Sequence, residues 1–165
     1  MPTLLRSRLL ACAFVAFAFG CAHVRTAAAR HEPTPGLAGH RTTLGQRAAA
    51  LAVREIGVPY RWGGISPAGG FDCSGLVYWA YRRLGIAVPH SSYGLYDVGR
   101  RVARSRMRPG DLLFFSGLGH VGIYIGRGRM VHAPHTGARV QVVSLRRSVY
   151  GRSLVGVRRI ARGRS

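Results

Sequence analysis

The apolar and polar positions divide the chain beyond residue 41 into a helical first half and a β-rich second half. Residues 43–57 (TLGQRAAALAVREIG) predict a helix that Thr43 can cap and Gly57 can end. A second helix is predicted from Cys73 to Leu84, with Asp72 as its cap and Gly85 as its end. Apolar residues lie on one face of this helix at helical spacing: Leu76, Val77, Ala80, Tyr81 and Leu84.

The second half contains short apolar segments separated by Gly and Pro, a pattern typical of an antiparallel sheet. These segments are DLLFFS (111–116), HVGIYIG (120–126), RMVHAPH (129–135), ARVQVVSL (138–145) and LVGVRRI (154–160). Residues 58–70 are predicted to form a loop, and residues 89–99 a loop with one short helix. Helices followed by strands indicate an α+β domain, with N-terminal helices packed on a C-terminal antiparallel β-sheet.

The N-terminal segment predicts export. Arg6 and Arg8 precede an apolar stretch of 12 residues, LLACAFVAFAFG, which is short for a membrane span and typical of a signal peptide. Two cleavage sites remain open. The signal peptide is predicted at residues 1–21 and would be of lipoprotein type if cleavage just before Cys21 leaves that residue lipidated; the alternative is cleavage after Ala29. Residues 22–41 are then a flexible tether, and residues 42–163 the folded domain.

Charge is the strongest compositional feature. The chain has 25 basic residues, all arginine, and 5 acidic ones, for a formal charge of +20. Such a surface attracts polyanions, whether nucleic acid, anionic lipid or an acidic cell-envelope polymer. The export signal disfavours nucleic acid as the partner, and charge alone does not distinguish the other two.

Cys73 is the one cysteine of the domain, because Cys12 lies in the leader and Cys21 at its end. A lone thiol excludes a disulfide framework and a multi-cysteine metal site. At a helix N-terminus, the exposed N–H groups favour the thiolate, and the pKa of a cysteine can fall from ~8.5 to about 3.5–7.5 when a base is near. We therefore expect a low pKa and a nucleophilic role for Cys73 rather than a place in the core.

A histidine must supply the base. If the loop of a hairpin is Gly126–Gly128, then His120 and His132 share one face of the sheet as diagonal neighbours, about 7–8 Å apart at the backbone. In the same register, His135 would point to the other face of the sheet. A two-residue loop would place His120 and His132 on opposite faces unless a bulge intervenes. Two histidines on one face, together with a cysteine at a helix N-terminus, indicate a relay of thiol, base and orienting group. A zinc site is the weaker alternative, since no second cysteine or carboxylate lies at ligand spacing.

Five fragments in order resemble the NlpC-type cell-wall cysteine endopeptidases, over roughly Leu44 to Ile160. They are PYRWGG, FDCSGLVYWAY, RPGDLLFFS, GHVGIYIG and MVHAP. The resemblance implies a papain-like fold and hydrolysis of amide bonds in peptidoglycan stem peptides, either the γ-D-glutamyl–diamino acid bond or the cross-link. It implies a nucleophile, a base and an orienting residue at Cys73, His120 and His132, with substrate or oxyanion contacts from Tyr60, Asp72 and Ser74.

One departure from that family is His90, which stands where members commonly carry an arginine; it is a candidate substrate contact, and the sequence does not define its role. No metal or cofactor is expected, and the domain is expected to be a monomer whose partner is peptidoglycan. The chain would lie in the bacterial cell envelope, periplasmic or anchored to a membrane by a lipid on Cys21. The alternatives are an amidase of the related CHAP type and a non-catalytic envelope-binding module.

Overall fold

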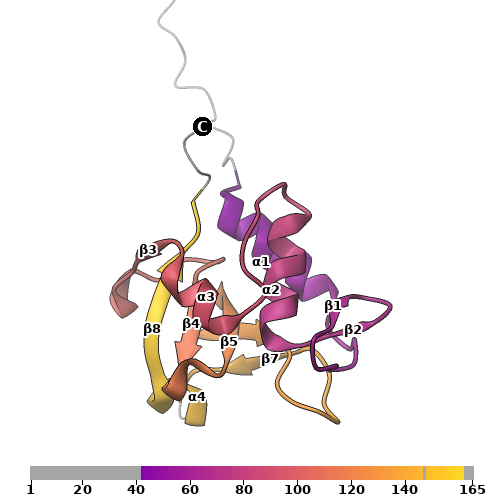
Figure 1. The fold of residues 1–165 in the computed structure, drawn as a ribbon. Helices are drawn as coiled ribbons and strands as arrows, with labels where there is room; N and C mark the ends of the chain where they lie inside the picture. The colour runs from indigo at the N-terminus through magenta and orange to yellow at the C-terminus, as the bar shows by residue number, and fades with distance from the viewer. Residues whose placement is uncertain (1–41, 147, 162–165) are drawn as a thin grey trace, which may run out of the picture. The chain divides into compact units, whose positions relative to one another are not determined.

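The computed structural model of the protein describes residues 42–161 except Arg147, and only these are discussed below. The predicted signal peptide, Cys21, the tether and the domain's last two residues lie outside the described residues. Within the described part, no helix combines the length and the apolar character needed to cross a membrane. Figure 1 shows helices gathered beside a twisted sheet, so the predicted α+β class is confirmed.

The helices begin where the sequence supplies a cap. The first helix, α1 (Leu44–Arg54), starts after Thr43, whose hydroxyl accepts from the N–H of Gln46 while the Gln46 side chain accepts from the N–H of Thr43. The second, α2 (Cys73–Arg82), starts after Asp72 as predicted. It ends before the predicted limit at Leu84, in a turn that leads to Gly85 with a φ of 76°.

Six strands form the main sheet, in the order β3-β8-β4-β5-β6-β7, and every neighbouring pair is antiparallel. The five predicted strands are present, as β4 (Leu112–Phe115), β5 (Val121–Gly126), β6 (Arg129–His132), β7 (Gln141–Ser144) and β8 (Leu154–Arg159). The sixth strand, β3 (Arg100–Arg101), was not predicted, because two arginines carry no strand pattern.

The remaining elements are short. The predicted loop 58–70 holds most of a two-stranded ribbon, β1 (Ile65–Ser66) and β2 (Gly70–Phe71). The short helix expected within 89–99 is α3 (Ser92–Asp97). Two 3-10 turns and a helix complete the fold: η1 (Arg104–Arg106), η2 (Ser116–Leu118) and α4 (Val149–Ser153).

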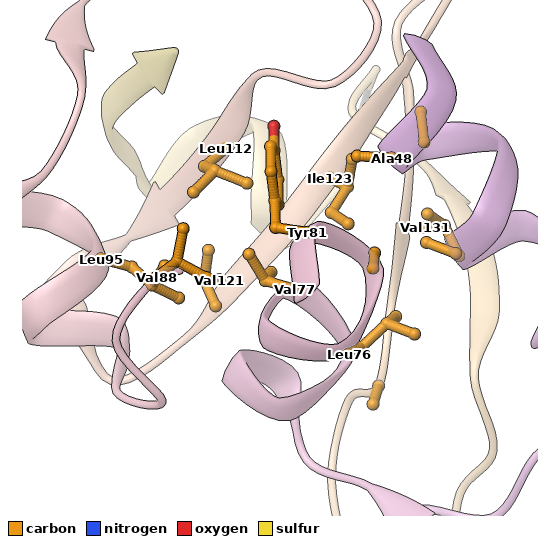
Figure 2. Packing of buried hydrophobic residues seen from close by; sticks show 14 of the residues in the cluster. Ala48, Leu76, Val77, Tyr81, Val88, Leu95, Leu112, Val121, Ile123 and Val131 are labelled. Carbon is orange, nitrogen blue, oxygen red and sulfur yellow. The ribbon is translucent and has the colours of Figure 1, made fainter. Parts of the chain in front are cut away.

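The core lies on both faces of the sheet. Along β4, Leu112 and Phe114 join a larger cluster with α1 and α2, while Leu113 and Phe115 join a smaller cluster on the other face. All four β4 side chains are buried, so this strand shows a continuous apolar run rather than alternation. Figure 2 shows α2 presenting Leu76, Val77 and Tyr81 to the strands that carry Leu112, Val121 and Ile123.

The first turn of α1 is fixed directly to the segment that enters β4. A Cβ at Gly45 would lie 2.9 Å from the Pro109 carbonyl oxygen and 3.2 Å from the Gly110 Cα. Gly110 has a φ of 95°, which only glycine adopts readily. The two glycines therefore allow two backbones to approach more closely than side chains would permit.

Candidate active site

The carboxylate of Asp72 organises the start of α2. Its Oδ1 accepts from the N–H of Gly75 at 2.6 Å and from the hydroxyl of Ser74 at 2.9 Å. Its Oδ2 accepts from the N–H of Gly63 at 2.9 Å, so a single side chain joins the helix to the loop before β1. The predicted cap is confirmed, and this side chain is buried together with that of Ser74.

The same loop approaches α2 without space for a side chain at Gly75. A Cβ there would overlap the carbonyl oxygen of Gly64. The N–H of Asp72 donates to that carbonyl at 3.1 Å. This close contact holds Tyr60 and Trp62 at the rim of the cavity that Cys73 lines.

Cys73 is partly exposed and lines a cavity of about 510 Å³. The other lining residues come from five segments: Tyr60, Trp62, Gly63, Asp72, Ser74, His90, Ser91, Ser92, Tyr93, Gly119, His120 and Pro134. The cavity thus collects the predicted nucleophile and base together with Tyr60, Asp72 and Ser74. His132 is not at its surface, as expected for a residue that lies behind the base.

The expectation of a low pKa for Cys73 is wrong. Burial raises the pKa of the thiol above its ordinary value, and the nearby Asp72 carboxylate adds to the rise. Backbone N–H groups of Val121, Ser74 and Cys73 oppose this effect but do not reverse it. The contact with Val121 also places the sulfur beside the residue that follows His120.

A β-bulge brings the two histidines together. Strand β5 turns into β6 through the two-residue loop Arg127–Gly128, not the three-residue loop that the sequence analysis assumed. Ile123 lies opposite Val131, in the assumed register, but Gly126 lies opposite Arg129 because the register shifts between Tyr124 and Gly126. The extra residue in the bulge compensates for the shorter loop.

His120 and His132 are hydrogen bonded, with Nε2 of His120 2.9 Å from Nδ1 of His132. Burial lowers the pKa of His120 to about 4 and that of His132 to about 3, and repulsion from His135 contributes to both. Both rings are therefore neutral near pH 7. If Nε2 of His120 donates to His132, then Nδ1 of His120 keeps a lone pair that can accept a proton from a thiol.

An aromatic wall, formed by Phe115 and Tyr150, supports the histidine pair. The Tyr150 ring lies 4.9 Å from the His132 ring and 5.7 Å from the His120 ring. Phe115 lies 5.7 Å from His120 and 5.2 Å from Tyr150. The Nε2 atom of His132 is buried, and no described residue hydrogen bonds to it. Sequence reasoning missed Tyr150, which comes from α4 and carries no recognisable signal.

Two other residues at the cavity, His90 and Trp62, extend the predicted site. His90 Nε2 lies 3.3 Å from both carboxylate oxygens of Asp72, so the departure at this position contacts the cap of α2. Trp62 is 88% exposed at the rim. An exposed Trp beside a Gly pair indicates a contact surface, a signal that is present in the sequence itself.

His135 does not follow the predicted geometry, because β6 ends at His132 and strand parity cannot extend to it. It is exposed, and its Nδ1 lies 2.9 Å from the carbonyl oxygen of Thr136. Its charge still lowers the pKa of both other histidines. That it is dispensable stays a prediction.

Within residues 42–161, Arg147 excepted, no three His, Cys, Asp or Glu residues are grouped closely enough to hold a metal ion. What is present is one thiol and one neutral imidazole at the cavity, with a second neutral imidazole hydrogen bonded behind the first. This arrangement suits nucleophilic attack by sulfur with a histidine as proton acceptor.

Comparison with known proteins identifies the family. The sequence profile of the NlpC/P60 family matches residues 57–159. The chain belongs to the NlpC/P60 family. A probable endopeptidase of Mycobacterium tuberculosis is 50% identical over 111 residues, which cover 67% of this chain and 28% of the relative. The murein DD-endopeptidase MepH of Escherichia coli is 42% identical over 127 residues, covering 70% of this chain and 47% of MepH.

The fold also matches a solved structure. An NlpC/P60 family protein from Bacillus cereus superposes with a TM-score of 0.66 at 34% identity, over 72% of this chain and 40% of that one. The papain-like α+β fold implied by the sequence is thereby confirmed. The chain spans less than half the length of the two curated relatives, at 28% and 47%.

The low histidine pKa values predict an unusual acid limb of activity. His120 can accept a proton only while neutral, so the kcat/KM of a reaction that uses it as the base should fall through about pH 4 rather than near the ordinary histidine pKa. An acid limb centred near pH 6.5, the ordinary histidine pKa of about 6.5, would contradict the assignment of His120 as the base.

The folding stability should depend on pH over a wider range than the activity does. The unfolded chain binds protons at histidine from about pH 6.5 downward, whereas the folded chain does not until about 4 and 3. Folding stability at these groups is therefore lost as pH falls through this window. Thermal midpoints between pH 7 and 4 measure the loss, and His132→Gln should reduce its slope.

Proposed function

We propose that the protein is a cysteine endopeptidase that hydrolyses amide bonds in peptidoglycan stem peptides. The observation that carries the proposal is the shared cavity of Cys73 and His120, with His120 hydrogen bonded to His132 at 2.9 Å. The names of the relatives support the substrate class, since both are endopeptidases and one is a murein DD-endopeptidase. Action on peptidoglycan implies a place in the cell envelope.

In the proposed first step, the thiol of Cys73 transfers its proton to Nδ1 of His120 as the sulfur attacks the carbonyl carbon. Because burial raises the pKa of the thiol and lowers that of His120, the resting pair is neutral. The transfer therefore takes place as substrate enters and displaces water. Polar groups of the bound peptide then stabilise the charges that form.

The resulting oxyanion can be stabilised by the backbone N–H of Cys73 and by the Tyr60 hydroxyl. Burial raises the pKa of Tyr60, with further contributions from Cys73 and Asp72, so it remains a donor. Collapse of the intermediate breaks the C–N bond, and His120 protonates the leaving amine. His120 next takes a proton from water, which attacks the thioester and releases the carboxylic acid and the thiol.

His132 orients the base in this scheme. Its Nδ1 fixes which nitrogen of His120 faces the thiol, and its burial beside Tyr150 restricts the ring. Asp72 and Ser74 are proposed to contact the stem peptide from the cavity floor, with His90 at their side. Both the γ-D-glutamyl bond and the cross-link remain candidate bonds.

Replacing the nucleophile gives the most direct test. Cys73→Ala should reduce peptidoglycan digestion by at least about 10³-fold, because no other group can form the thioester. Fragment mass spectrometry of digested peptidoglycan measures the loss and identifies the bond. Circular dichroism should show a folded Cys73→Ala variant, and EDTA should leave the wild type active. Undiminished digestion by the folded variant would reject the mechanism.

The two histidines should respond differently. His120→Ala removes the base and should lower kcat by about 10²–10⁴-fold. His132→Gln and His132→Asn keep a polar group at the orienting position and should retain more activity than His132→Ala. His135→Ala is the matched control, with activity near wild type. Equal losses for His132→Gln and His132→Ala would argue against an orienting role.

Cys21 is proposed to carry a lipid that anchors the chain to a membrane. If so, the mature protein should sediment with membranes, and Cys21→Ser should release it. N-terminal sequencing distinguishes the alternative, since cleavage after Ala29 would give a soluble protein beginning at Arg30. The enzyme is expected to act as a monomer, which light scattering of the Cys21→Ser form can measure.

A further inference from the structure

A basic groove lies at the sheet edge formed by β3, away from the active site. It has a volume of about 590 Å³, and five of the residues that line it are arginines: Arg100, Arg101, Arg106, Arg108 and Arg159. Strands β8 and β4 separate β3 from β5, which follows His120. Figure 1 shows β3 and β7 at opposite sides of the sheet.

The strand pairing at this edge places positively charged side chains directly opposite each other. Arg100 lies directly opposite Arg159, and Arg101 lies directly opposite Arg158. Like charges in such pairs destabilise a sheet. Arg159 is compensated by Asp111, and the Arg158 guanidinium lies 3.9 Å from the centre of the Tyr96 ring. Arg100 and Arg101 have no such compensation, because Arg159–Asp111 is the one arginine–carboxylate ion pair among the described residues.

The backbone beneath the exposed arginines is held in place. Arg159 donates from Nη2 to the Arg106 carbonyl at 3.1 Å, and from Nε and Nη2 to the Asp111 carboxylate at 2.6 and 2.7 Å. The N–H of Arg108 donates to the same carboxylate at 2.7 Å. Asp111 is 1% exposed, so a buried charge network fixes a loop whose arginine side chains face solvent. The groove is therefore largely formed before any ligand binds.

The lining of the groove indicates what would bind. Guanidinium groups bind phosphate oxygens in pairs, and several of them in one concave groove suit an anion repeated along a chain. A membrane surface is a poorer match, because interfacial binding also needs apolar anchors. The exposed large apolar residues of the described chain all lie outside this groove: Val53, Ile56, Trp62, Ile65, Tyr93, Val149 and Val155.

Nucleic acid is a poorer match for a related reason. Grooves that bind single strands combine basic residues with aromatic side chains on which bases stack. The lining contains no aromatic residue, since its other members are Val102, Ala103, Ser105 and Met107. We propose that this groove binds a linear phosphodiester polymer that lacks aromatic bases, such as poly(glycerol phosphate). This role is independent of the proposed peptidase activity.

The test compares two variants of the full chain that lose the same charge. One replaces Arg100, Arg101, Arg106 and Arg108 with Gln. The control replaces Arg47, Arg54, Arg82 and Arg83 with Gln, a second arginine cluster that lines a different cavity on α1 and α2. Binding of poly(glycerol phosphate) is measured by calorimetry at about 50 and about 200 mM salt, a range over which phosphate contacts change affinity strongly.

The groove variant should bind at least about tenfold more weakly at the lower salt concentration. Its slope of log K against log salt should be shallower by about 3, from about 0.7 for each of the lost contacts. The control should change affinity by less than about twofold, as expected for charges distant from the ligand. Equal losses in both variants would show that only net charge matters and would overturn the proposal.

Stability provides a second measurement. Replacing Arg100 and Arg101 removes two like-charge pairs, so the thermal midpoint of the Arg100→Gln/Arg101→Gln variant should rise. The polymer should raise the midpoint of the wild type through binding to the folded state. If neither the double variant nor the wild type with polymer has a higher thermal midpoint, the proposal that the polymer relieves repulsion among these arginines is contradicted. The groove variant should also cleave a soluble stem peptide at the wild-type rate if the peptidase proposal holds.

Competing ligands complete the design. Polyglutamate of equal length should bind more weakly than poly(glycerol phosphate), and equal binding would reject a phosphate preference. Tighter binding to phosphatidylglycerol vesicles, or to a single-stranded DNA oligonucleotide, would overturn the assignment in favour of a lipid or a nucleic acid.

Discussion

The site depends on the hydrogen bonds that the Asp72 carboxylate accepts. The carboxylate starts α2, fixes the Ser74 hydroxyl and holds the loop through Gly63. Without this carboxylate, the first turn of α2 would lose its cap. The loop that carries Tyr60 and Trp62 would lose the hydrogen bond that attaches it to the helix. Burial is the main reason that the pKa of the neighbouring Cys73 thiol is raised, and the Asp72 charge adds to the rise. The side chain that positions the thiol therefore does not help it to ionise.

The histidine pair shows a related compromise. Tyr150 packs against both rings and Phe115 against that of His120, while His132 is fully buried and His120 reaches the cavity. This packing leaves His132 Nε2 buried without a hydrogen-bond partner among the described residues. Burying a polar atom in this way costs stability. We interpret the cost as the consequence of keeping the base in one orientation, which a more open site would not achieve.

Local signals predicted most of the fold and the main residues of the site. The cap at Asp72, the apolar face of α2 and the five strands follow from short-range rules, and so they were correct. Pairing of His120 with His132 was also predicted, but through a loop of the wrong length, since a bulge has no clear sequence mark. The pKa of Cys73 was mispredicted because burial depends on tertiary packing. Tyr150 and β3 were missed for the same reason, since each is defined by partners distant in sequence.

The contact between Gly45 and the Pro109–Gly110 segment has a consequence for sequence change. A side chain at Gly45 would meet the Pro109 carbonyl oxygen, and one at Gly110 would overlap the backbone of Gly45. Either would push α1 away from the segment that leads into β4, a strand paired on one side with β8 and on the other with β5. The spacing between the helical layer and a central strand is therefore set by two residues that have no side chain.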